Sequence, residues 1–146
     1  MGMKKGIALL AGLVLAAGCT PAATTPAPAG SATTSMLENT DWRLVEVGGR
    51  PALGATNAPT LRLDPAEHRA GGNTGCNHFG GGYELSGPSL RFRELVSTRR
   101  ACTDPAMNEQ EAAYVRALDE TRSWRIDGSS LVLSGASGVV ARFTTP

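Results

Sequence analysis

Residues 71–83 read Gly-Gly-Asn-Thr-Gly-Cys-Asn-His-Phe-Gly-Gly-Gly-Tyr, and residues 97–105 read Ser-Thr-Arg-Arg-Ala-Cys-Thr-Asp-Pro. The first stretch predicts an irregular loop, because glycine readily adopts left-handed and bulged backbone conformations. The second stretch ends in Asp104-Pro105, which favours the start of a helix, since Asp is a preferred N-cap and Pro suits the first helical position. Each stretch holds one cysteine, Cys76 or Cys102. A bond between them would tie the loop to the helix.

A disulfide is the preferred interpretation of the pair Cys76 and Cys102. It would close a loop of about 27 residues, for which the chain-entropy model gives about 3.5 kcal/mol of stabilisation. A zinc site that adds His78 and His68 is less favoured, because Cys-x-His is not a common structural zinc spacing. A catalytic thiol at Cys76 with His78 as base is less favoured still, since residues two apart on an extended segment converge only by local accident. No metal is therefore expected.

The N-terminal segment has the features of a secretory signal. Lys4 and Lys5 precede an apolar run from Gly6 to Gly18, which has the length of a signal core and is too short to span a bilayer. Leu15-Ala16-Ala17-Gly18-Cys19 resembles a bacterial lipobox, although Ala16 stands where Leu is usual. The resemblance implies cleavage before Cys19 and a diacylglycerol on its thiol. Thr20 in place of Asp favours sorting to the outer membrane.

Three segments follow from this pattern. Residues 1–18 form the signal peptide, and residues 19–36 form a tether of Pro, Ala, Thr and Ser that buries too little apolar area to fold. Residues 37–146 form the domain. The mature chain has twelve arginines against thirteen acidic residues, so it lacks the basic field of a nucleic-acid-binding protein. Attachment to a membrane would depend on the lipid at Cys19.

The domain is expected to be mainly β, because short alternating runs separated by turn residues dominate it. Strands are expected over residues 40–47, 58–63, 67–71, 82–86, 89–93, 95–99, 123–126, 130–133 and 139–143, the third being weak. The helix after Pro105 has an apolar face of Met107, Tyr114, Val115 and Leu118. We expect a curled or barrel-like antiparallel sheet of about seven or eight strands with one helix packed on it. Its interior would be filled by Trp42, Leu44, Leu61, Tyr83, Leu85, Leu90 and Phe92.

The domain resembles the META domain family. The most specific signals are Gly75-Cys76-Asn77-His78-Phe79 and the Thr98-Arg99-Arg100-Ala101-Cys102 stretch, supported by Trp42-Arg43-Leu44 and Asp104-Pro105-Ala106-Met107. The resemblance implies a small barrel-like sheet with one helix, often behind a lipoprotein signal, and association with envelope stress, antibiotic tolerance and motility. It transfers no catalytic residue. The signature residues are Gly75, Asn77, Thr98 and Arg99.

Structural roles are expected for these signature residues. Asn77 would cap a turn or adopt a left-handed conformation. Thr98 would be a strand residue, and Arg99 would pair with Glu84 or Glu94.

The sequence predicts a non-enzymatic lipoprotein, because no Ser-His-Asp or paired-carboxylate motif stands in it. It would be a monomer without cofactors, on the periplasmic face of the outer membrane, and would bind an unidentified envelope protein or ligand. Two alternatives remain open. The sheet could carry a small apolar ligand, or the chain could inhibit a lysozyme or a protease.

Overall fold

The computed structural model describes residue 2 and residues 33–34, 36–54 and 56–146, and this part of the chain contains nine strands and the helix α2. The elements are β1 (Trp42–Val47), β2 (Arg50–Pro51), β3 (Thr60–Asp64), β4 (Arg69–Asn73), β5 (His78–Ser86), β6 (Ser89–Ser97), α2 (Pro105–Glu120), β7 (Ser123–Asp127), β8 (Ser130–Gly135) and β9 (Gly138–Thr144). Residues 33–34 and 36–37 are also helical. None of the helices in these described ranges has the length and apolar character needed to cross a membrane.

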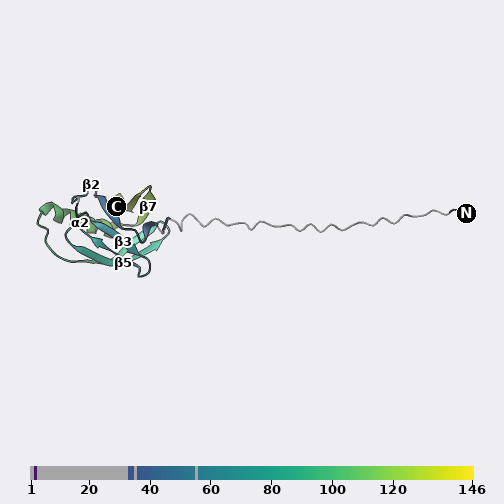
Figure 1. The fold of residues 1–146 in the computed structure, drawn as a ribbon, viewed down its shortest axis with the longest axis horizontal. Helices are drawn as coiled ribbons and strands as arrows, with labels where there is room; N and C mark the ends of the chain where they lie inside the picture. The colour runs from purple at the N-terminus through teal and green to yellow at the C-terminus, as the bar shows by residue number, and fades with distance from the viewer. Residues whose placement is uncertain (1, 3–32, 35, 55) are drawn as a thin grey trace.

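The strands form one antiparallel sheet that closes on itself (Figure 1). Its order is β2-β1-β3-β4-β5-β6-β7-β8-β9, and a further pairing of β1 with β9 completes the ring. The predicted curled or barrel-like sheet with one helix packed on it is therefore confirmed. The short strand β2, which pairs with the end of β1, was not predicted.

The ring is weakest between β6 and β7, which pair at one position, Ser89↔Ser123. Beyond that pair, α2 lies beside β6. Leu95, Val96 and Ser97 of β6 and Val115 and Leu118 of α2 line the same small gap. The helix thus takes the place that a strand would fill in a complete barrel, and it covers an edge that would otherwise be open to pairing with other chains.

The glycine-rich stretch is more regular than predicted. Most of it belongs to β4 and β5, whose register pairs Gly71 with Gly80 and Gly72 with Phe79. Only residues 74–77 remain as a turn between the two strands. Glycine is needed at position 72 because the backbone of Thr60 packs directly against it. A Cβ on Gly72 would lie 2.0 Å from the carbonyl oxygen of Thr60. The separate strand predicted over residues 95–99 is instead the end of β6, which continues past a bulge opposite β5.

Gly72→Ala is expected to lower the free energy of unfolding by about 2 kcal/mol or more, because the new methyl group meets fixed backbone and the strands must move apart. Gly80→Ala in the neighbouring strand is the matched control. Its Cβ would come no closer than 3.7 Å to Arg69, which is ordinary van der Waals contact. Urea unfolding of both variants measures the difference. Equal stabilities for the two variants would contradict the assigned role of Gly72.

Side chains fill the interior of the ring. Of the residues predicted to point inward, Leu85 is only partly covered and the others are buried. The core also includes Leu63, Phe79, Tyr114, Leu118, Leu131, Leu133 and Phe143. Leu37, from the segment before β1, is fully buried, and its carbonyl oxygen accepts a 2.9 Å hydrogen bond from the indole of Trp42.

Helix α2 begins where the sequence predicts. Asp104 is the N-cap, and its side chain accepts a 2.9 Å hydrogen bond from the backbone N–H of Ala106. The buried face differs from the predicted one, since it consists of Gln110, Tyr114, Ala117 and Leu118. Met107 and Val115 are half-buried. The difference is due to Gln110. Its amide accepts from the N–H of Leu53 and donates to the carbonyl oxygen of Leu53, which allows a polar side chain to be buried where the apolar pattern predicts none.

Tyr114 makes the stability of the domain sensitive to high pH. Burial raises the pKa of this fully buried phenol, whose hydroxyl donates a 3.0 Å hydrogen bond to the carbonyl oxygen of Thr60. Because the folded-state pKa exceeds the unfolded value of about 10, its contribution is complete below that pH and is lost as pH rises further. Tyr114→Phe should cost about 1 kcal/mol at neutral pH and make the loss of stability above pH 10 shallower. Urea unfolding at neutral and alkaline pH measures both effects, and identical alkaline slopes would contradict the prediction.

Candidate functional site

The two signature stretches meet through a disulfide between Cys76 and Cys102, with their Cα atoms 5.6 Å apart. The predicted bridge is confirmed. Cys76 lies in the turn between β4 and β5, and Cys102 lies in the segment that leads into α2. Gly75 has a φ of +107°, which favours glycine at this position. Thr74 closes the turn, because its side-chain oxygen accepts from the N–H of Asn77 and its own N–H donates to the carbonyl of Asn77.

Asn77 is the centre of the hydrogen-bond network beside this disulfide. Its side chain is buried, and the residue is 3% exposed. The amide nitrogen donates to the carbonyl oxygen of Arg100 at 2.8 Å and to the two carboxylate oxygens of Glu111 at 2.8 and 2.9 Å. The amide oxygen accepts from the hydroxyl of Thr98 at 2.8 Å and from the N–H of Arg100 at 2.7 Å. One amide therefore joins the turn, the segment after β6 and the helix.

The structure corrects three predicted roles. The side chain of Asn77 does not cap the turn and its backbone is not left-handed, because its amide instead bonds to residues 98, 100 and 111. Thr98 follows the last residue of β6, where its hydroxyl donates to Asn77. Arg99 pairs with neither Glu84 nor Glu94 in the described residues, and the carboxylate of Glu84 pairs with Arg93 at 2.7 Å.

Sequence reasoning missed Glu111 and Arg100 as members of this network. Arg100 contributes its backbone, which no residue-type motif can reveal. Glu111 stands on the same side of α2 as Tyr114, three positions before it, and that spacing was the available signal. In the described part of the chain, the guanidinium groups of Arg99 and Arg100 take part in no ion pair.

A hollow of about 470 Å³ lies next to this network. We call it the signature hollow, and its lining consists of Asn77, Ser97, Thr98, Arg99, Arg100, Ala101, Asn108, Glu111, Ala112 and Val115. Ala112 and Val115 of α2 give it an apolar wall, and the segment with the two arginines gives it a basic one. Its volume falls in the range of small-molecule and peptide sites, so it is large enough to hold a ligand.

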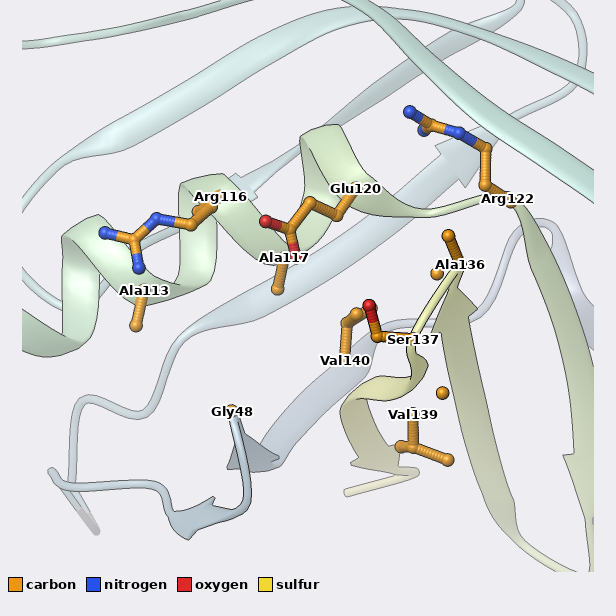
Figure 2. A pocket seen from close by; sticks show the side chains of 12 residues that line it. Gly48, Ala113, Arg116, Ala117, Glu120, Arg122, Ala136, Ser137, Val139 and Val140 are labelled. Atoms are coloured by element: carbon orange, nitrogen blue, oxygen red, sulfur yellow. The ribbon is translucent and has the colours of Figure 1, made fainter.

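A second hollow, of about 560 Å³, lies between the last half of α2 and the turn that joins β8 to β9 (Figure 2). Its walls are mostly small residues, among them Ala113 and Ala117 of the helix, Gly135 at the end of β8 and Ala136 of the turn. The guanidinium of Arg122 is engaged with the carbonyl oxygens of Asp119 and Thr121, where it stabilises the end of the helix. This hollow contains none of the signature residues, so we assign the candidate site to the signature hollow.

One cluster of potential metal ligands converges in the described residues: Cys76, Cys102 and Glu111, with donor atoms within 4.8 Å of one another. Because the disulfide occupies both sulfur atoms, the cluster offers a metal ion a single carboxylate. The two histidines of the zinc alternative do not join it. His68 lies beside Tyr83, with ring centroids 6.2 Å apart, and His78 is exposed on β5.

The META domain family matches residues 35–146, which include every strand and the helix. The chain belongs to the META domain family. Heat shock protein HslJ of Escherichia coli (strain K12) is 28% identical over 137 residues, covering 92% of this chain and 91% of that protein. A Burkholderia xenovorans protein solved by NMR has a TM-score of 0.65 and 27% identity over 90% of this chain and 99% of its own. A second NMR structure has a TM-score of 0.63 and 25% identity, and covers 77% of this chain and 94% of that one.

The predicted signal peptide, apart from Gly2, together with Cys19 and most of the predicted tether, lies outside the described residues of this META domain protein. Lipidation of Cys19, the segment boundaries and the cellular location therefore stay predictions from sequence. The signature residues Gly75, Asn77, Thr98 and Arg99 are all described. Asn77, Thr98 and Arg99 line the signature hollow, whereas Gly75 lies in the turn two positions before Asn77 and outside the lining.

Proposed function

We propose that this META domain protein is a lipid-anchored binding protein of the cell envelope that contacts its partner through the signature hollow. The observation that carries the proposal is the contrast between the two places where a ligand could bind. Large side chains fill the interior of the ring. The signature hollow is open, is about 470 Å³ in volume and is held in shape by the disulfide and Asn77. This contrast favours surface binding over the carriage of an apolar ligand inside the barrel.

The position of the hollow suits a tethered protein. Thr34 and Glu38 lie beside Leu85 and Gly87, near the turn from which β6 starts, so the chain enters the domain at that end. The hollow begins at Ser97, the last residue of β6. Nine strand residues separate the two ends, a span of about 30 Å. The chain therefore enters the domain at one end of β6 and the signature hollow lies at the other, so an anchor at Cys19 leaves the hollow accessible to a partner.

The role is an accessory one in stress resistance. The relative in Escherichia coli is named heat shock protein HslJ, which supports a link to heat stress for this chain. We further propose the periplasmic face of the outer membrane as its location, since Thr20 follows Cys19.

Complementation of a deletion strain tests the proposal. The strain is challenged with heat and with an envelope-directed antibiotic, and receives either the full chain or its Cys19→Ala variant. We expect the full chain to restore survival and to incorporate labelled palmitate. The Cys19→Ala variant should take up no label and fail to restore survival. Survival unaffected by the deletion, or full rescue by Cys19→Ala, would overturn the proposal. Inhibition of lysozyme by the purified chain would instead support the inhibitor alternative.

A further inference from the structure

The signature hollow has a chemical character that narrows its ligand. Two arginines, Arg99 and Arg100, stand next to each other in its lining, and neither forms an ion pair in the part of the chain that the structure describes. Three arginines elsewhere in the described domain do form ion pairs: Arg62 with Asp41, Arg93 with Glu84 and Arg142 with Glu46. Guanidinium groups recognise carboxylates in a planar, two-pronged geometry. The hollow therefore offers two free cationic contacts.

The one carboxylate in the lining is already engaged. Both oxygens of Glu111 accept from the amide nitrogen of Asn77, which holds the group against the floor of the hollow. The other two charged groups that line the hollow, the guanidinium groups of Arg99 and Arg100, are positive and have no ion-pair partner among the described residues. Charge complementarity therefore favours an anionic ligand.

Apolar contacts continue from the hollow along β6. Ala112 and Val115 form the helix wall, and Val115 and Ser97 are shared with a smaller gap that Val96 also lines. Val96 is 69% exposed, the largest exposed fraction among the large hydrophobic side chains of the described residues. A ligand that carries only a charge, such as a phosphate ion, would leave this surface uncovered. A ligand with both acidic and apolar side chains would cover it.

The backbone beside the hollow favours an extended peptide. The N–H of Thr98 donates to the carbonyl of His78, and that of Arg100 donates to Asn77, so both are directed toward β5 and its turn. Between them, the backbone N–H and C=O of Arg99 form no hydrogen bond in the described part of the chain, so both can pair with a ligand. A strand-like peptide can pair with such groups while its side chains alternate between two surfaces.

We infer that the signature hollow binds an extended acidic segment of a partner protein, with its carboxylates on Arg99 and Arg100 and its apolar side chains on Ala112, Val115 and Val96. This inference rests on the proposed binding function and names the class of partner. It does not depend on the lipid anchor, so an experiment can contradict the acidic-peptide inference and leave the proposed lipid anchor standing, or the reverse.

Fluorescence anisotropy of a labelled peptide with alternating Asp or Glu and Val residues tests the inference on the purified Cys19→Ala chain. A probe with Asn and Gln in place of the acidic residues controls for charge. We expect the acidic probe to bind, and the neutral probe to bind at least tenfold more weakly. A higher salt concentration should weaken binding of the acidic probe, because the ion pairs that it forms lie at the surface. The amide NMR signals of Arg99, Arg100 and Ala112 should shift on binding.

Variants locate the binding. Arg99→Glu combined with Arg100→Glu should lower the affinity for the acidic probe at least tenfold. Arg125→Glu is the control and should leave that affinity unchanged, because Arg125 is an exposed arginine of β7 that also forms no ion pair in the described structure. Thermal unfolding of each variant confirms that it is folded. Inorganic phosphate and phosphatidylglycerol vesicles are tested in parallel. No binding at about 1 mM peptide, equal loss in Arg125→Glu, or binding of phosphate or vesicles but not of the peptide would each overturn the inference.

Discussion

Removing the Cys76–Cys102 disulfide is expected to lower the free energy of unfolding by about 3.5 kcal/mol. The bond joins residues 26 positions apart and connects the turn between β4 and β5 to the start of α2. Without it, the unfolded chain gains the freedom of an open loop. A loss of this size is a large part of the stability of a domain of this length. Urea unfolding of the Cys76→Ala and Cys102→Ala double variant, with the parent chain unfolded with and without reductant, measures it.

Cys19→Ala is the control for this experiment, because it also removes a cysteine and we expect no change in stability. The double variant and the reduced parent chain should agree within error. A reduced parent chain that unfolds at the same urea concentration as the oxidised one would contradict the assigned role of the bridge.

Asn77→Ala is expected to destabilise the domain by about 3 kcal/mol. The substitution removes the partner of Thr98, of the carboxylate of Glu111 and of both backbone groups of Arg100 at once. Asn108→Ala is the matched control. Asn108 is an exposed asparagine that bonds only to the segment before and at the start of α2, so its loss should cost about 1 kcal/mol.

Asn77→Asp keeps the shape of the side chain and tests the contact with Glu111 specifically. It places one carboxylate against another, where the amide nitrogen now lies 2.8 Å from the Glu111 oxygen. We expect a loss as large as that of Asn77→Ala, and a partial recovery when Glu111→Gln is added, because glutamine supplies the missing donor. A double-mutant cycle in urea measures the coupling. Additive effects would contradict a direct Asn77–Glu111 contact.

Local signals in the sequence predict the parts of this fold that depend on local chemistry. Asp104-Pro105 predicts the start of α2, and the Asp127-Gly128 turn predicts the hairpin of β7 and β8. The disulfide was predicted from the two cysteines of the domain and their loop length, together with the lack of a zinc or catalytic spacing. These features need no knowledge of which distant segments meet.

Other features depend on long-range register and could not be predicted. The side chain of Asn77 bonds to residues 21 to 34 positions away, and that of Gln110 bonds to Leu53 at a separation of 57 positions. The glycines of β4 and β5 led to the prediction of a loop, because glycine has low strand propensity. Their place in the sheet follows from close packing against Thr60, which is fixed only when the ring closes.

Photo-crosslinking in intact cells tests most directly whether the signature hollow is the binding face. A photoreactive amino acid is placed at Ala112 inside the hollow and, in a second strain, at Arg125 on β7 outside it. The proposed function predicts a discrete crosslinked species from Ala112 that is absent from Arg125 and that disappears when Arg99→Glu and Arg100→Glu are added. Equal crosslinking from both positions, or crosslinking from Arg125 alone, would contradict it.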